Sequence, residues 1–79
     1  MQLGKYRHYK NNYYEVLGVA QNTETREKMI VYRALYDCPD LLDEYGPDPW
    51  FVRPSDMFNE KVEVDGVFVP RFEYVGPMP

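Results

Sequence analysis

The dipeptide Asp65-Gly66 stands between two short β-forming runs, residues 61–64 and 67–69. Asp-Gly readily adopts the positive φ angles of a two-residue type I′ turn, and this turn joins antiparallel strands with little choice of register. The sequence therefore predicts a β-hairpin here. The residues predicted to face one another are Val64 and Val67, Val62 and Val69, and Glu60 and Arg71.

Three further segments have the composition of strands. Residues 4–10 and 13–20 are rich in β-forming side chains, and Asn11-Asn12 between them tolerates positive φ angles, which predicts a second hairpin. The run 29–36 is β-branched and aromatic and is apolar on both faces, as expected of a central strand. A short strand is predicted over 50–53, where a proline follows.

The other segments lack the pattern of a strand or of an amphipathic helix. Residues 21–28 are polar and predict a loop. Residues 37–49, here called the acidic excursion, combine prolines with acids and predict the most exposed part of the chain, with at most a turn over 40–45. Residues 54–58 begin with proline and suit a single 3₁₀ turn. The tail 76–79 is expected to fray.

Five or six short strands with one 3₁₀ turn indicate an all-β (mainly β) fold. Closure removes the unpaired edges of so short a sheet, so we expect a small, partly open antiparallel barrel. The length of 79 residues corresponds to one domain, residues 1–79, with a thin core.

A single cysteine, Cys38, excludes an internal disulfide, and a cytoplasmic location fits the chain best. No apolar run approaches the roughly 20 residues of a membrane-spanning helix, and no membrane partner is expected. The formal net charge is −4, and five of the 13 acids lie between Asp37 and Asp48. Because the rest of the chain is nearly neutral, the net charge excludes few partners.

Side chains that commonly carry catalysis are scarce. The one serine, Ser55, lies in a predicted turn, and Cys38 lies among acids, which disfavour a reactive thiolate. His8 is the only histidine, so no Cys/His zinc site forms within one chain. The acidic excursion lacks the EF-hand spacing, and no glycine-rich phosphate loop occurs. We therefore predict no metal, no cofactor and no catalytic residue.

Aromatic and cationic side chains alternate on the predicted strands. Such side chains stack on bases, cage a methylated amine or grip a carboxylate. The candidate ligand-binding residues are Tyr6, Arg7, His8, Tyr32, Arg33, Trp50 and Arg53. The alternative is a structural role, in which the rings form the core and the arginines pair with Glu15, Glu63 or Glu73.

Two arginines in this set have special positions. Arg33 interrupts the most apolar strand, and a buried guanidinium is costly unless it is paired or faces a cleft. Arg53 ends the short strand that begins at Trp50, at a rim where loops gather. We predict that both arginines share one concave surface with Tyr6, Tyr32 or Trp50.

These observations favour a non-catalytic binding module that recognises an anionic peptide, a protein surface or a small ligand through a rim of arginine and aromatic residues. Single-stranded nucleic acid is an alternative partner, which the acidic excursion disfavours. A second alternative is a catalytic or accessory domain of an enzyme that uses carboxylates for acid–base chemistry and arginine to hold an anionic substrate.

The chain also shows a family resemblance. The runs concerned are GKYRHYK at 4–10, YEVLGVA at 14–20, VYRALY at 31–36, WFVRP at 50–54, MF at 57–58, VEVDG at 62–66 and VPRFEY at 69–74. In order and spacing they resemble the small bacterial family named domain of unknown function 1653. The resemblance spans nearly the whole chain and implies a small SH3-like barrel, without an assigned activity. The segment 38–49 is longer than the turn expected in that family, and Asn11-Asn12 stands where a lysine–glycine type of turn is usual.

Overall fold

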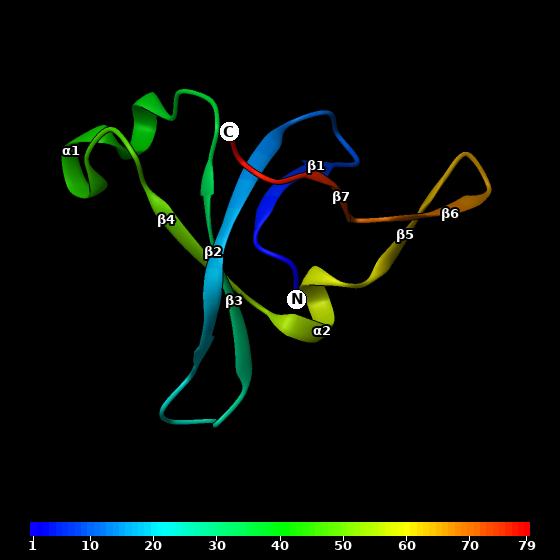
Figure 1. Cartoon of the computed structure of the whole chain (residues 1–79), viewed down its shortest axis with the longest axis horizontal. Helices are drawn as coiled ribbons and strands as arrows, with labels where there is room; N and C mark the ends of the chain where they lie inside the picture. The colour runs from blue at the N-terminus through cyan, green and yellow to red at the C-terminus, as the bar shows by residue number, and fades with distance from the viewer.

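The computed structural model describes all residues, 1–79, as seven strands, two single-turn α-helices and one 3₁₀ turn (Figure 1). The elements are β1 (Gly4–His8), β2 (Tyr13–Gln21), β3 (Lys28–Ala34), η1 (Pro39–Leu41), α1 (Leu42–Tyr45), β4 (Trp50–Pro54), α2 (Ser55–Phe58), β5 (Lys61–Val64), β6 (Val67–Pro70) and β7 (Phe72–Gly76). The predicted mainly β fold is confirmed, with seven strands instead of five or six.

Five strands form one antiparallel sheet in the order β4-β3-β2-β1-β7, and β5 and β6 form a separate two-stranded sheet. In Figure 1 the β5–β6 hairpin extends away from the larger sheet. β4 and β7 do not pair with each other, so the larger sheet is not closed into a barrel. β3 lies between two strands, as predicted for its apolar run.

Both predicted hairpins are confirmed. Val64 faces Val67 and Val62 faces Val69, and the turn residues Asp65 and Gly66 have φ angles of 51° and 80°. Glu60 and Arg71, which were predicted to face each other, are also adjacent, since the backbone N–H of Arg71 donates to the Glu60 carbonyl at 3.0 Å. In the first hairpin, Asn11 has a φ of 70°, as its position between β1 and β2 requires.

Three local predictions were wrong. Residues 72–76 were not predicted as a strand, yet they form β7 and pair with β1. The turn after Pro54 is α-helical rather than 3₁₀, because the N–H of Asn59 donates to the Ser55 carbonyl four residues earlier, at 3.0 Å. The acidic excursion is not the most exposed segment: it ends in the buried Pro49, whereas no residue of β5 or β6 is buried. No helix here is long and apolar enough to cross a membrane.

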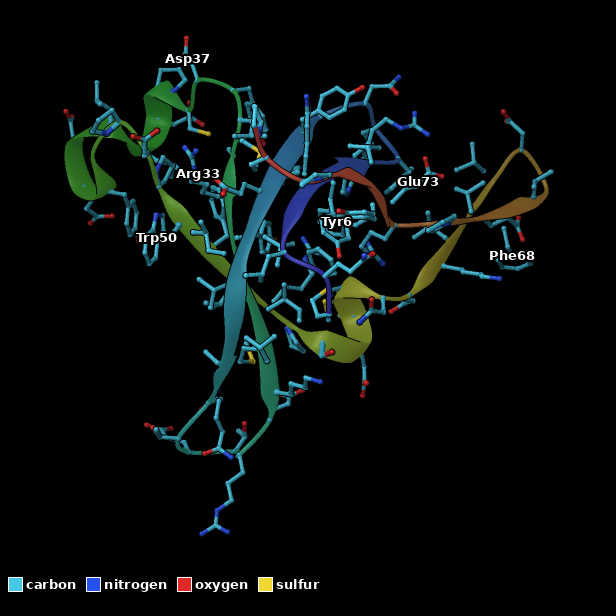
Figure 2. All side chains as sticks on the ribbon, viewed as in Figure 1. Tyr6, Arg33, Asp37, Trp50, Phe68 and Glu73 are labelled. Carbon is cyan, nitrogen blue, oxygen red and sulfur yellow. The ribbon has the colours of Figure 1, made fainter.

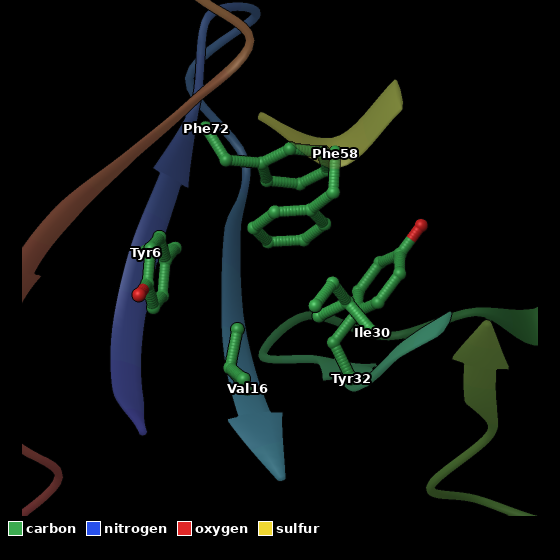
Figure 3. Packing of buried hydrophobic residues seen from close by; sticks show 6 residues of the cluster. All are labelled: Tyr6, Val16, Ile30, Tyr32, Phe58 and Phe72. Atoms are coloured by element: carbon green, nitrogen blue, oxygen red, sulfur yellow. The ribbon is translucent and has the colours of Figure 1, made fainter. Parts of the chain in front are cut away.

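The core lies on one face of the five-stranded sheet, called here the inner face (Figure 3). Its buried residues are Tyr6, Val16, Ile30, Tyr32, Phe58 and Phe72. Phe58 comes from α2 and stacks on Phe72 with ring centroids 4.0 Å apart and nearly parallel planes. Because Phe58 is the one member outside the strands, the single-turn helix α2 completes the core.

Candidate functional site

The largest cavity of the structure is a groove of about 420 Å³ beside β4. We call it the β4 groove. Its lining is mostly hydrophobic and consists of Tyr32, Leu41, Tyr45, Pro49, Trp50, Phe51, Val52 and Arg53. Trp50 is 65% exposed, and Figure 2 shows its ring projecting away from the core. An exposed tryptophan beside a groove of ligand size is typical of a binding surface.

The β4 groove follows a free edge of the sheet. β4 stands at the end of the strand order and pairs only with β3. Five consecutive residues, 49–53, line the groove, so side chains from both faces of the strand contribute to it. On an edge strand, every second residue turns its backbone N–H and C=O away from its neighbour. No hydrogen bond outside the ladder uses the backbone of 50–53, so these groups are free.

The opposite wall of the groove is the acidic excursion, which folds back beside β4 (Figure 1). η1 and α1 follow one another, and Gly46 ends α1 with a φ of 78° while its N–H donates to the Leu42 carbonyl at 2.9 Å. This short helical segment places Leu41 and Tyr45 against the groove. The excursion is therefore part of the candidate site.

Three of the seven candidate residues meet in the β4 groove: Tyr32, Trp50 and Arg53. Tyr32 is buried, and its hydroxyl oxygen accepts a hydrogen bond from Arg53 Nε at 3.2 Å. Arg53 also lies over the ring of Phe72, with its guanidinium carbon 5.6 Å from the ring centroid. Arg53 forms no ion pair, so its charge remains available to a ligand.

Arg33 does not line the groove, and the prediction that it shares a concave surface with Arg53 is wrong. Arg33 lies on the outer face of β3, because Tyr32 on one side of it in the chain points into the core. There its Nε lies 2.7 Å from Glu15, the residue opposite it on β2, and its Nη1 lies 3.5 Å from Asp48. Because Arg33 forms these two ion pairs, its positive charge is already balanced within the protein.

Tyr6 and Arg7 also lie outside the β4 groove. Tyr6 is a core residue whose hydroxyl donates to the Gln2 carbonyl at 2.7 Å. Its pKa is raised, mainly by burial and to a smaller extent by the nearby Tyr74. Arg7 pairs with Glu73 at 3.8 Å. Arg7 and Glu73 both line a smaller cavity of about 240 Å³ beside the β5–β6 hairpin. Because they pair with each other, neither charge is free for a ligand there.

His8 lies beside Phe72, with the two ring centroids 4.9 Å apart and the planes nearly perpendicular. Its Nδ1 accepts a hydrogen bond from the Lys10 backbone N–H at 3.2 Å. Burial lowers the pKa of His8, and the positive charges of Arg53, Arg71 and Lys10 lower it further. His8 and Arg53 therefore approach the same phenylalanine ring and repel each other when the imidazole is protonated.

The lowered pKa of His8 predicts that acidification destabilises the protein. A histidine with a lower pKa in the folded than in the unfolded state binds fewer protons when folded, so the free energy of unfolding falls with pH below its ordinary value of 6.5. The titratable and charged groups around it are Arg53, Arg71, Lys10, Tyr9 and Tyr14. We expect the Tm to fall between about pH 7 and about pH 5, and to fall less in a His8→Gln variant. Equal slopes would contradict this role of His8.

Sequence reasoning missed Leu41 and Tyr45, which line the β4 groove. The signal for them was the presence of large apolar side chains four residues apart inside an acidic run, the spacing of one helical face. No three His, Cys, Asp or Glu side chains lie together as a metal would require.

The family model described as "Protein of unknown function (DUF1653)" matches residues 4–74. A crystal structure of a DUF1653 protein from Bordetella bronchiseptica is similar over 100% of this chain and 92% of that chain, with 37% sequence identity and a TM-score of 0.84. No curated protein matches.

Proposed function

This chain belongs to the DUF1653 family, and we propose that it is a non-catalytic binding module whose β4 groove takes an extended, acidic peptide segment of a partner protein. The observation behind the proposal is a mostly apolar groove that follows a free strand edge. A peptide lying there continues the sheet by backbone hydrogen bonds to β4, which is a recurrent mode of peptide recognition.

The side chains around β4 give such a peptide two different surfaces. Trp50 and Val52 lie on the outer face and are exposed, whereas Phe51 and Arg53 point to the inner face beside the core. Successive peptide residues would meet these faces in turn. Apolar peptide side chains fit the outer face, and the exposed ring of Trp50 is the expected main contributor to the binding energy.

The position of Arg53 is the reason to expect a carboxylate in the bound segment. It is the one charged residue that lines the groove, and its only hydrogen-bond partner is the neutral hydroxyl of Tyr32. A carboxylate accepts hydrogen bonds from a guanidinium more strongly than a neutral group does. A polyphosphate backbone fits less well, because repeated phosphates need several cations, and Arg53 is the one cation in the groove lining.

Trp50 permits a direct test, since it is the only tryptophan and it lines the groove. Peptides selected from a random displayed library against the whole domain are titrated while tryptophan emission is followed. We expect binding to shift the emission to the blue as the ring is covered, and β4 amides to become protected from hydrogen exchange. We also expect the selected sequences to alternate apolar residues and to carry an acid.

Two variants that keep Trp50 sharpen this test. Tyr45→Ala and Arg53→Gln are each expected to weaken peptide binding about tenfold or more, which corresponds to about 1.4 kcal/mol. Tyr13→Ala, on the outer face of β2, is the matched control and is expected to bind normally. Peptides that bind without changing Trp50 emission or β4 exchange would overturn the proposal. A single-stranded oligonucleotide that binds at Trp50, with affinity falling steeply as salt rises, would replace the peptide by nucleic acid.

A further inference from the structure

The β5–β6 hairpin is a two-stranded sheet with no third strand beside it. No residue of β5 or β6 is buried, and the two strands pair only with each other. A two-stranded hairpin is marginally stable by itself, and a further strand or another packed element stabilises it. In Figure 1 the hairpin extends away from the five-stranded sheet, so another molecule can approach it.

The outer edge of β5 is free in the same way as the outer edge of β4. No hydrogen bond outside the β5–β6 ladder uses the backbone of 61–64. Every second residue of β5 therefore turns its backbone N–H and C=O away from β6. Two free edges of this kind join by backbone hydrogen bonds when they meet. β4 and β5 thus each carry the groups that the other can pair.

The sequence of β5 has the pattern that the β4 groove is expected to select. Val62 and Val64 lie on one face of the strand, and Lys61 and Glu63 lie on the other. Apolar residues therefore alternate with charged ones, and an acid is among them. The strand is also already extended in the hairpin, so little conformational entropy is lost when it binds.

The charges of the two surfaces are complementary. Arg53 is the one charged residue that lines the β4 groove, and it forms no ion pair. Glu63 is exposed and also forms no ion pair, whereas Glu15 and Glu73 are both paired with arginines of their own chain. A free guanidinium on one surface thus corresponds to a free carboxylate on the other.

We infer that a second copy of this chain supplies the strand that the β4 groove takes, and that this strand is its β5. The inference rests on the proposed function, because it names the partner of the same groove. In the alignment that puts the two valines of β5 beside Trp50 and Val52, Glu63 lies on the same face of the joined sheet as Arg53. A guanidinium and a carboxylate on one face form a charge-assisted hydrogen bond.

The contact joins two different surfaces of the chain. β4 and the β5–β6 hairpin lie on opposite sides of the molecule (Figure 1), so one copy can use both at the same time. Contacts between unlike surfaces close into a ring or continue along a row of copies. In either case the mean mass of the particles in solution is expected to rise with protein concentration.

The first test follows the whole domain by analytical ultracentrifugation over a wide range of concentration. We expect the mean mass to rise, and the emission of Trp50 to shift to the blue over the same range as its ring is covered. We also expect the backbone amides of β4 and β5 to become protected from hydrogen exchange together. A mean mass that stays that of one chain overturns the inference, and so does protection of β7, the other free edge of the larger sheet, in place of β5.

The second test exchanges the two charges. Arg53→Glu and Glu63→Arg are each expected to weaken self-association at least tenfold, because each puts like charges on the groove and the hairpin. Mixing the two variants is expected to restore association, since the groove of either one then meets a hairpin of opposite charge. Glu24→Arg, at an exposed acid of the β2–β3 loop, is the matched control and is expected to associate as the wild type does.

The exposed position of Glu63 makes Glu63→Arg the variant that decides if Arg53→Glu does not fold. Association that Glu63→Arg leaves unchanged, or that Glu24→Arg weakens equally, overturns the inference. The two proposals can fail separately. Selected peptides that still cover Trp50 in a chain that stays monomeric keep the β4 groove as a peptide site and overturn only the second copy as its partner.

Discussion

The Phe58→Ala variant is expected to lose about 3–5 kcal/mol of its free energy of unfolding. Phe58 is 1% exposed, stacks on Phe72 and presents its ring to Tyr6 and Tyr32 at centroid distances of 5.6 and 5.4 Å. Removing it leaves a cavity at the centre of a thin core that cannot easily collapse. Since whole domains are stable by only about 5–15 kcal/mol, this one substitution removes much of the total.

Phe68→Ala provides the matched control for urea denaturation. Phe68 is the same residue type but is 64% exposed on the β5–β6 hairpin, far from the core (Figure 2). Its replacement is expected to change the free energy of unfolding by no more than about 0.5 kcal/mol. Similar losses in the two variants would mean that the Phe58–Phe72 stack does not hold α2 against the sheet.

Gly4→Ala is expected to cost about 2–4 kcal/mol, the second largest effect of a single substitution considered for this chain. Gly4 has a φ of 130°, which residues with a side chain rarely adopt. A Cβ there would lie 2.7 Å from the Gly76 carbonyl oxygen and 3.1 Å from the Cα of Pro77. Both obstacles are backbone atoms, so β1 and β7 would have to separate.

Gly18→Ala is the control for this prediction, because a Cβ at Gly18 meets no atom within 4 Å and its φ is not positive. We expect Gly18→Ala to unfold at nearly the same temperature as the wild type. Hydrogen exchange should locate the damage from Gly4→Ala in β1 and β7. If both variants lose equal stability, general loss of glycine flexibility, and not close strand approach, is the cause.

The parts of the fold that could be predicted are those fixed by neighbouring residues. Asp65-Gly66 and Asn11-Asn12 each set a turn, and the turn sets the register of the strands beside it. β7 was missed because it has no turn partner of its own: it pairs with β1, from the far end of the chain. The 3₁₀ prediction after Pro54 failed because proline at the start of a turn is compatible with either kind of helix.

The candidate site was only partly predictable for a related reason. Sequence patterns selected Trp50 and Arg53 by residue type, but alternation along β3 placed Arg33 on the opposite face from Tyr32. Whether an arginine meets a carboxylate depends on strands that are distant in sequence, as the pairing of Arg33 with Glu15 shows. His8 on β1 and Arg53 on β4 both approach Phe72 on β7, and that arrangement depends on the order of the strands in the sheet.

The pairing of β1 with β7 also governs how the chain reaches this structure. Tyr6 faces Tyr74, so contacts between nearly the first and nearly the last residues must form before the sheet is complete. Phe72 belongs to β7, so the ring of Phe58 has no stacking partner until β7 has paired with β1. Contacts of such long sequence separation raise the contact order, and a high contact order slows folding. The local hairpins can form before β1 pairs with β7, so the core that includes Phe72 is expected to be completed after them.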